Sequence, residues 1–276
     1  MSVNRCSVRY PALSRANVTK RSRAAVTRDI YHDAVREHWG IRAQQGAKQA
    51  ANGVVQDAGT RANVTGGKHL VPLENAIASV FEDHDGIGEY LTVLNGGNHT
   101  LPGWYRRAKN WDLVVTYRGL LIAAIEFKSQ VGSIGNNHNN RTEESLGNAT
   151  DLWRAHEAEA FRGHRPWLGY VLLLEKSPKS TNPVRDGRAL FTTDPEFDGI
   201  SYLDRYRVTY QRLLAERLYD GAVVAASEKG EGVYDEPVPE LSFATFEAKI
   251  FGRLEELKRI PDESFPEPLP GLLPPR

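Results

Sequence analysis

The 276-residue sequence has one cysteine, Cys6, one methionine and no net charge at pH 7. A lone thiol forms no internal disulfide and supplies no cluster of thiolate metal ligands. No apolar run approaches the roughly 20 residues that a membrane-spanning helix needs, and the N-terminal segment lacks the apolar stretch of a secretory signal. A hydrophobic share of 40% excludes a disordered chain. We therefore expect a globular protein of the reducing cytoplasm with no membrane partner.

The balanced total charge hides a gradient along the chain. Residues 1–50 contain ten basic and three acidic side chains, whereas residues 226–276 contain six basic and eleven acidic ones. A basic N-terminal part suits contact with a polyanion, because lysine and arginine neutralise phosphates and release counterions. A solvated, charged helix would have the same composition. Charge alone leaves these two interpretations open.

Hydrophobic periodicity predicts a mixed α/β protein. Helices are expected over residues 24–39, 72–85, 143–161, 203–219 and 243–257. Residues 111–128 read as a hairpin that turns at Arg118-Gly119, and further buried strands are expected over residues 168–175 and 222–226. The segment 129–142 is expected to be a polar loop. We predict a mixed central β-sheet flanked by helices, with a basic N-terminal arm and helical region over residues 1–69, a core over 70–260 and a proline-rich tail over 261–276.

The sharpest chemical signal lies on the predicted hairpin. Asp112 lies near the start of its first strand, and Glu126 and Lys128 lie near the end of its second. Side chains two residues apart lie on the same side of a strand, so an acid, a second acid and a lysine can converge at one end of the hairpin. Two carboxylates suit Mg²⁺, which keeps water and phosphate oxygens as its other ligands. This pattern indicates a metal site at Asp112 and Glu126 for phosphodiester hydrolysis, with Lys128 orienting water or stabilising charge.

A triplet of glutamate, any residue and lysine also occurs at ordinary strand ends, where the two charges pair in solvent. Here the triplet ends an apolar run that should be buried, and unpaired buried charges are costly. A second acid arrives from the neighbouring strand. These two features favour the metal site.

Two further segments could contact DNA. The predicted loop after the triplet contains Asn136, Asn137, Asn139, Asn140 and Arg141. Asparagine can bind adenine and arginine can bind guanine through paired hydrogen bonds in the major groove, although asparagine is also common in turns and caps. Before Asp112, the aromatic and basic segment 104–109 could grip the DNA backbone through Arg106, Arg107 and Lys109, or could be a solvated connector.

The residues of the hairpin and of the segment that follows it resemble those of known protein families. The arrangement of Asp112, Glu126 and Lys128 resembles the PD-(D/E)xK nuclease core, and the string AAIEFKSQVGSIGNNHNNRTEESLGNATDLW is similar to the XhoI-type restriction endonucleases. The likeness is strongest over residues 111–161. It implies a restriction-endonuclease-like fold with its nuclease core over residues 70–260. It also implies a Type II restriction endonuclease that acts as a homodimer, cuts both strands of double-stranded DNA within CTCGAG using Mg²⁺, and works beside a cognate DNA methyltransferase.

The resemblance places the motif's first acid on Asp112, its second on Glu126 and its lysine on Lys128. One departure is Trp111, which stands where the general motif has proline. In several related nucleases an acid on an earlier helix also reaches the metal, and Glu74 is the candidate here. A solvent-facing acid that stabilises the helix dipole is the simpler explanation for Glu74. Glu143 and Glu144 also lie near a predicted helix start, with the same two explanations.

Two rival functions remain at this point. One is a PD-(D/E)xK repair nuclease that recognises DNA structure rather than sequence. The other is a DNA-binding module without catalysis, in which the two acids and the lysine are only an ion-paired strand end. The first rival would nick or smear plasmid DNA, and the second would bind DNA without hydrolysing it.

Overall fold

The protein is built around one mixed β-sheet, seen in a computed structural model that describes residues 23–51, 68–84, 87, 90–185, 187 and 189–265. The expected basic arm and most of the proline-rich tail lie outside these residues. The six strands are hydrogen-bonded in sequence order. They are β1 (Leu91–Pro102), β2 (Ala108–Tyr117), β3 (Leu120–Gln130), β4 (Trp167–Glu175), β5 (Gly221–Ser227) and β6 (Tyr234–Asp235). Strands β3, β4 and β5 are parallel, and the other pairs are antiparallel.

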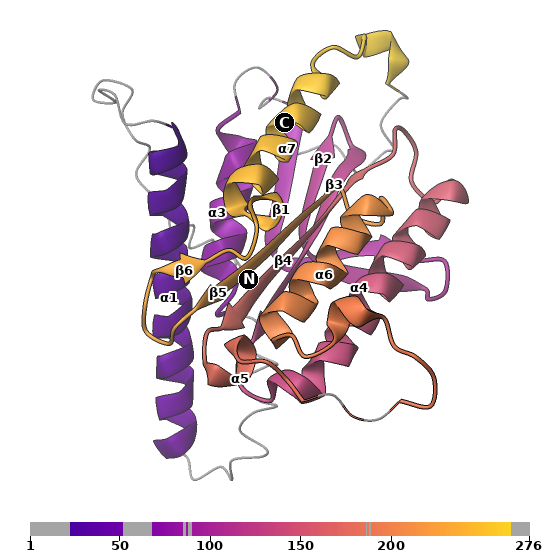
Figure 1. Ribbon diagram of the computed structural model, residues 1–276. Helices are drawn as coiled ribbons and strands as arrows, with labels where there is room; N and C mark the ends of the chain where they lie inside the picture. The colour runs from indigo at the N-terminus through magenta and orange to yellow at the C-terminus, as the bar shows by residue number, and fades with distance from the viewer. Residues whose placement is uncertain are drawn as a thin grey trace.

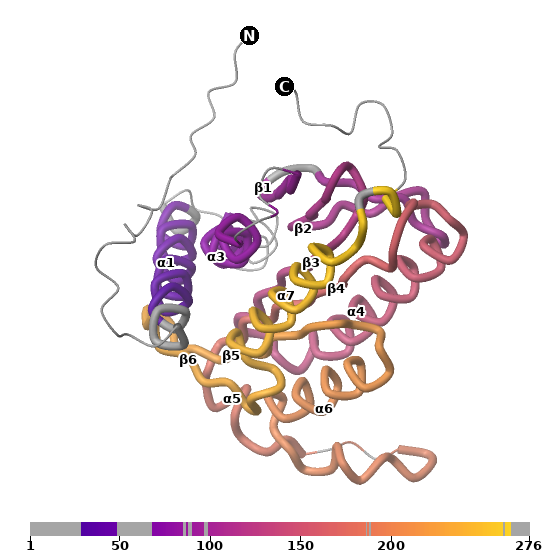
Figure 2. Tube along the Cα trace, turned by 90° about the horizontal axis from the view of Figure 1, so that it is seen from above, coloured from indigo at the N-terminus to yellow at the C-terminus, as the bar shows by residue number. Residues whose placement is uncertain are grey.

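Helices cover both faces of the sheet (Figures 1 and 2). One face packs against α1 (Arg23–Ala51), α3 (Val71–Glu82) and α7 (Phe243–Leu257), and the other against α4 (Ile134–Glu157) and α6 (Tyr202–Ala215). A short helix, α5 (Pro178–Thr181), and three 3₁₀ turns, η2 (Pro195–Phe197), η3 (Pro239–Leu241) and η4 (Asp262–Ser264), lie between or after these elements. The expected restriction-endonuclease-like arrangement of helices around a mixed sheet is confirmed. No helix in the described ranges is long and apolar enough to cross a membrane.

The predicted hairpin is β2 and β3. Its turn lies at Arg118 and Gly119, whose φ angles of 52° and 79° are both in the left-handed region. Two such residues fit the twist of a two-residue hairpin, and glycine adopts this conformation without steric cost. The strand expected over 168–175 is β4, the one over 222–226 lies within β5, and the helix over 243–257 coincides with α7.

Three expectations on local structure are corrected. The segment 129–142 is not a loop throughout, because α4 already begins at Ile134. Ile134 and His138 are buried on the inner side of this helix, so packing outweighs the weak helix propensity of its asparagines. The first helix continues past residue 39 to Ala51. Strand β1 was not predicted, since its Asn95, Gly96 and Gly97 resemble a loop.

The core layer beneath α7 depends on a glycine in the parallel strands. Gly221 in β5 packs against Trp167 of β4 and Phe246 of α7. An added Cβ there would lie 2.5 Å from Trp167 Cζ2 and 3.0 Å from Phe246 Cδ2. Separations this short require a ring or the backbone to move, so glycine is required for close packing at this point.

Gly221→Ala should therefore destabilise the protein by about 1–3 kcal/mol, because the extra methyl group overfills this layer. Gly147→Ala in α4 is the matched control: no heavy atom lies within 4 Å of the added Cβ, and alanine favours a helix. Urea unfolding would measure both variants. Equal stability of the two variants would contradict the packing argument.

Candidate active site

The site begins where β2 and β3 separate. Their backbone pairing ends at Leu113 and Ile125. One residue further along, the Asp112 Oδ2 atom accepts a hydrogen bond of 2.7 Å from the Phe127 amide. The side chain thus takes the place of a backbone acceptor beyond the last residue pair. This contact fixes the Asp112 carboxylate beside the end of β3.

Glu126 lies between two lysines. Its Oε2 atom lies 2.6 Å from Lys109 Nζ, and its Oε1 atom is ion-paired with Lys128 Nζ. The Glu126 side chain is only 4% exposed, compared with 11% for Lys109 and 25% for Lys128. Lys109 also lies over the ring of Trp111, with its ammonium 4.3 Å from the ring centroid. The buried carboxylate is therefore held from both sides by cations.

Glu74 joins the same group of acids from helix α3. It lies in the first turn of that helix and is 6% exposed, so it is not the solvent-facing acid of the simpler explanation. Burial, with the negative charges of Asp112 and Glu126, raises the pKa of Glu74 to about 8. Burial and the Glu126 charge raise the pKa of Asp112 to about 6. Three carboxyl groups thus repel one another at one buried end of the hairpin.

Asp112 and Glu126 have the chemistry that a hard divalent cation requires. Their oxygens are anionic, close enough to raise the pKa of Asp112, and already attract the ammonium groups of two lysines. Among the described residues, no three acidic, histidine or cysteine side chains are grouped so that they could hold a metal by themselves. A pair of carboxylates leaves the other coordination positions of a hard cation to water and phosphate oxygens.

The turn between β1 and β2 is fixed by a single carboxylate. Asp151 of α4 accepts hydrogen bonds from the amides of Trp104 and Tyr105, at 2.9 and 2.8 Å. Its other oxygen lies 2.7 Å from Arg106 Nε. These bonds hold the Asp151 pKa below its usual range despite partial burial. The turn leaves Trp104 and Tyr105 exposed, at 54% and 68%.

The predicted DNA-contacting residues of α4 have different surroundings. Asn136, Asn139 and Asn140 are exposed on the first turns of the helix. Asn139 Oδ1 lies 3.5 Å from His138 Nδ1, a long contact, whereas the Asn137 side chain donates to the Ser133 carbonyl at 3.1 Å. Arg141 is ion-paired with Glu144. The first three therefore have the access that base contact needs.

The basic residues of the predicted DNA-contacting segment are also divided. Arg107 is exposed in the β1–β2 turn. Arg106 is bound to Asp151 and Asn148, and Lys109 is bound to Glu126. Glu143 is exposed, whereas the charge of Glu144 helps to raise the pKa of Lys128. The structure thus groups Lys109, Glu74, Asp112, Glu126 and Lys128, and leaves Arg107 and the three asparagines on the surface.

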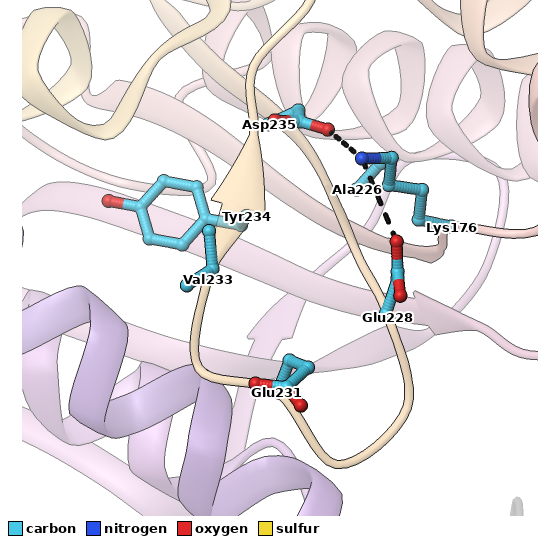
Figure 3. A pocket seen from close by; sticks show the side chains of 7 residues that line it. All are labelled: Lys176, Ala226, Glu228, Glu231, Val233, Tyr234 and Asp235. Atoms are coloured by element: carbon cyan, nitrogen blue, oxygen red, sulfur yellow. Dashed lines mark ion pairs between the residues drawn. The ribbon is translucent and has the colours of Figure 1, made fainter.

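Figure 3 shows a shallow pocket elsewhere on the sheet, at the β5–β6 edge. Lys176 Nζ lies 2.6 Å from Asp235 and 3.9 Å from Glu228. These side chains are 39%, 57% and 66% exposed. Ion pairs this open to solvent contribute little to the stability of the fold. None of the predicted site residues lines the pocket. The hairpin end is the better candidate for catalysis.

Two contacts of the site were missed from sequence. Lys109 was read as part of an aromatic and basic segment that could grip the DNA backbone or be a solvated connector, and its contact with Glu126 was not predicted. Asp151 gave no local signal, since its partners, two backbone amides and the Arg106 side chain, are distant in sequence. Arg106 in the β1–β2 turn was the one residue that hinted at a buried acidic partner.

A mixed sheet flanked by helices, with two acids and a lysine at the end of its hairpin, defines a nuclease of the restriction-endonuclease-like class. The sequence matches the family described as "Restriction endonuclease XhoI" over residues 48–236. The chain therefore belongs to the XhoI restriction endonuclease family and is a site-specific deoxyribonuclease.

Individual relatives agree with this assignment. Type II restriction enzyme BstVI of Geobacillus stearothermophilus is 40% identical over 209 residues, which cover 72% of this chain and 91% of that protein. Type II restriction enzyme XhoI of Xanthomonas vasicola is 38% identical over 159 residues, covering 56% of this chain and 64% of that protein. AbrI of Azospirillum brasilense is 49% identical over 100 residues, or 36% and 42% of the two chains. No solved structure matches the chain.

Glu74→Gln should stabilise the metal-free protein in a pH-dependent way. The pKa of Glu74 is raised to about 8 in the folded state, so stability is lost as the pH rises from about 4.5 to about 8, where the unfolded chain has already released this proton. The variant removes this loss. We expect little difference near pH ~4 and a gain of about 4 kcal/mol near pH ~8, measured by urea unfolding.

Glu216→Gln, at an exposed position after α6, serves as the control and should show no such trend. A Glu74→Gln variant that is equally destabilised at both pH values would contradict the buried, protonated state of Glu74.

Proposed function

We propose that the protein cuts both strands of DNA within the palindrome CTCGAG in a Mg²⁺-dependent reaction. The family supports a restriction endonuclease, and the observation that carries the chemistry is the buried group of Asp112, Glu126 and Lys128 at one hairpin end. CTCGAG is the sequence implied by the resemblance to XhoI-type enzymes. This proposal is more specific than the family assignment in its site, its metal and its residues.

Each catalytic residue has a defined task in this proposal. Asp112 and Glu126 would hold the metal, and the raised pKa of Glu74 limits the negative charge of the site before the metal binds. When bound, Mg²⁺ would act as a Lewis acid and lower the pKa of its water. The Lys128 side chain is one-quarter exposed, and its ammonium beside Glu126 stabilises charge on the phosphodiester and orients the attacking water.

DNA contact is assigned to two surfaces. The exposed Asn136, Asn139 and Asn140 read base edges, and the β1–β2 turn holds the backbone through Arg107 and its exposed aromatic side chains. Asn137, Arg106 and Arg141 have partners within the protein, so we assign them to shaping these surfaces.

The assembly follows from the symmetry of the substrate. A palindrome presents two equivalent half-sites, so two chains related by a two-fold axis would each cut one strand. We therefore propose a homodimer that acts in the cytoplasm. A cognate methyltransferase would modify the same sequence and protect the host DNA, as a functional partner without physical contact.

Substitution at the hairpin end tests the chemistry. Glu126→Gln or Lys128→Ala should lower the cleavage rate at least roughly a hundredfold, because each removes a group that stabilises the transition state, while the fold and much DNA binding persist. Plasmid cleavage with Mg²⁺, followed by sequencing of the fragment ends, measures both rate and site.

Lys179→Met, on the exposed surface of α5, is the control and should cleave at the normal rate. Near-normal cleavage by either hairpin variant would remove the proposed catalytic group. Nicks or smears from the unmodified protein would favour a structure-specific repair nuclease, and DNA binding without any hydrolysis would favour a non-catalytic binding module.

Alanine at Asn136 or Asn140 should reduce discrimination between CTCGAG and single-base variants by about 1–3 kcal/mol at particular positions. The reason is that each side chain's donor and acceptor match one base edge. Arg107→Ala should instead weaken binding to all duplexes alike and reduce its salt dependence, because phosphates carry no sequence information. Fluorescence anisotropy at two salt concentrations measures both effects. Equal weakening on every duplex by the asparagine variants would assign the start of α4 to backbone contact.

A further inference from the structure

The charges at the hairpin end balance without a metal. Asp112 and Glu126 carry the negative charge of the proposed metal site, and the ammonium groups of Lys109 and Lys128 lie next to Glu126. Both oxygens of the Glu126 carboxylate are therefore occupied by cations of the protein itself. A divalent cation that binds Glu126 at short range has to share or replace one of these contacts.

The two lysines are placed differently. Lys128 belongs to the same strand as Glu126 and lies two residues further along it. Lys109 reaches Glu126 from β2 and follows the β1–β2 turn, which Asp151 holds at the surface. Lysine has a long, flexible stem with a compact charge at its end, so the Lys109 ammonium can leave Glu126 while its backbone stays fixed. The backbone of Lys109 lies next to the exposed β1–β2 turn, so its side chain can reach the protein surface by a short movement.

Electrostatic repulsion decides between sharing and replacement. Like charges a few ångströms apart repel by several kcal/mol at the effective dielectric of a partly buried protein site. The Lys109 ammonium lies 2.6 Å from Glu126 Oε2, and the Lys109 side chain is only 11% exposed, so little water is available to screen it from a cation on the same carboxylate. Replacement is therefore favoured over sharing.

We propose that Lys109 is an exchangeable internal cation, which neutralises Glu126 in the metal-free protein, leaves it when a divalent cation binds, and then contacts a DNA phosphate. This proposal rests on the proposed nuclease function for its DNA-bound state. Lys109 is a positioning residue for Glu126 before binding and a phosphate contact afterwards. Glu126 and the DNA phosphate compete for the Lys109 ammonium. A metal ion that displaces Lys109 from Glu126 frees it for the phosphate, so DNA and metal strengthen each other's binding, as reciprocal linkage requires.

Calcium titration of the full-length protein without DNA tests the exchange. Isothermal titration calorimetry of Lys109→Met should give Ca²⁺ binding roughly tenfold tighter than that of the unmodified protein, because no ammonium has to be displaced. Lys109→Arg keeps the charge and should remain close to the unmodified protein. Lys179→Met is the surface control and should also leave the affinity unchanged. Adding Glu126→Gln to Lys109→Met should abolish the gain.

Two outcomes would overturn the proposal. Ca²⁺ binding by Lys109→Met that is equal to or weaker than that of the unmodified protein would make Lys109 a structural ion pair. A gain that persists in the double variant with Glu126→Gln would place the cation elsewhere. Circular dichroism melting checks that the variants fold, and Lys109→Gln provides a second neutral side chain with a polar end.

The second part of the experiment repeats the Ca²⁺ titration in the presence of a CTCGAG duplex. The duplex should tighten Ca²⁺ binding to the unmodified protein several-fold and should have a smaller effect on Lys109→Met, where the competition is absent. An equal effect of DNA on both proteins would overturn the coupling. Because Ca²⁺ binding without DNA requires no cleavage, failure of the exchange is distinguishable from failure of the nuclease function, which shows as a lack of Mg²⁺-dependent cutting by the unmodified protein.

Discussion

Mutual repulsion between buried carboxyl groups is the constraint around which this site is organised. Glu74, Asp112 and Glu126 come from three different elements, and two of them have pKa values raised by burial and by their neighbours. Such a group is stable only if protons or cations offset its charge. Here a proton on Glu74 and the ammonium groups of two lysines do so. A divalent cation that enters this group would have to compete with the two ammonium groups.

Strand β3 has an apolar core layer on one face and the charged side chains of the site on the other. Phe127 belongs to the apolar layer beneath α1, α3 and α7, whereas Glu126 and Lys128 point to the other face. Each charged residue is thus held by a strand whose alternate side chains are fixed in the core. Asp112 completes the arrangement through its bond to the Phe127 amide, which ties the position of the first acid to the backbone between the second acid and the lysine.

Much of this architecture could be predicted from sequence, because its main elements have strong local signals. The hairpin was evident from two apolar runs around Arg118-Gly119, and alternation placed Glu126 beside Lys128. The start of α4 was predicted as a loop because asparagine favours turns, yet buried Ile134 and His138 hold it in a helix. The burial of Glu74 and the contact of Lys109 with Glu126 depend on packing between distant segments. No local pattern encodes them.

Helix α4 sets a fixed length between two surfaces of the protein. Asn140 lies near its beginning and Asp151, which anchors the β1–β2 turn, lies eleven residues later. At 1.5 Å per residue this separation is about 17 Å along the helix axis, or about five base-pair steps of 3.4 Å in B-form DNA. Because the helix is continuous between these two positions, an enzyme that contacts DNA through Asn140 and through the β1–β2 turn would respond to the rise and twist of the duplex as well as to its bases.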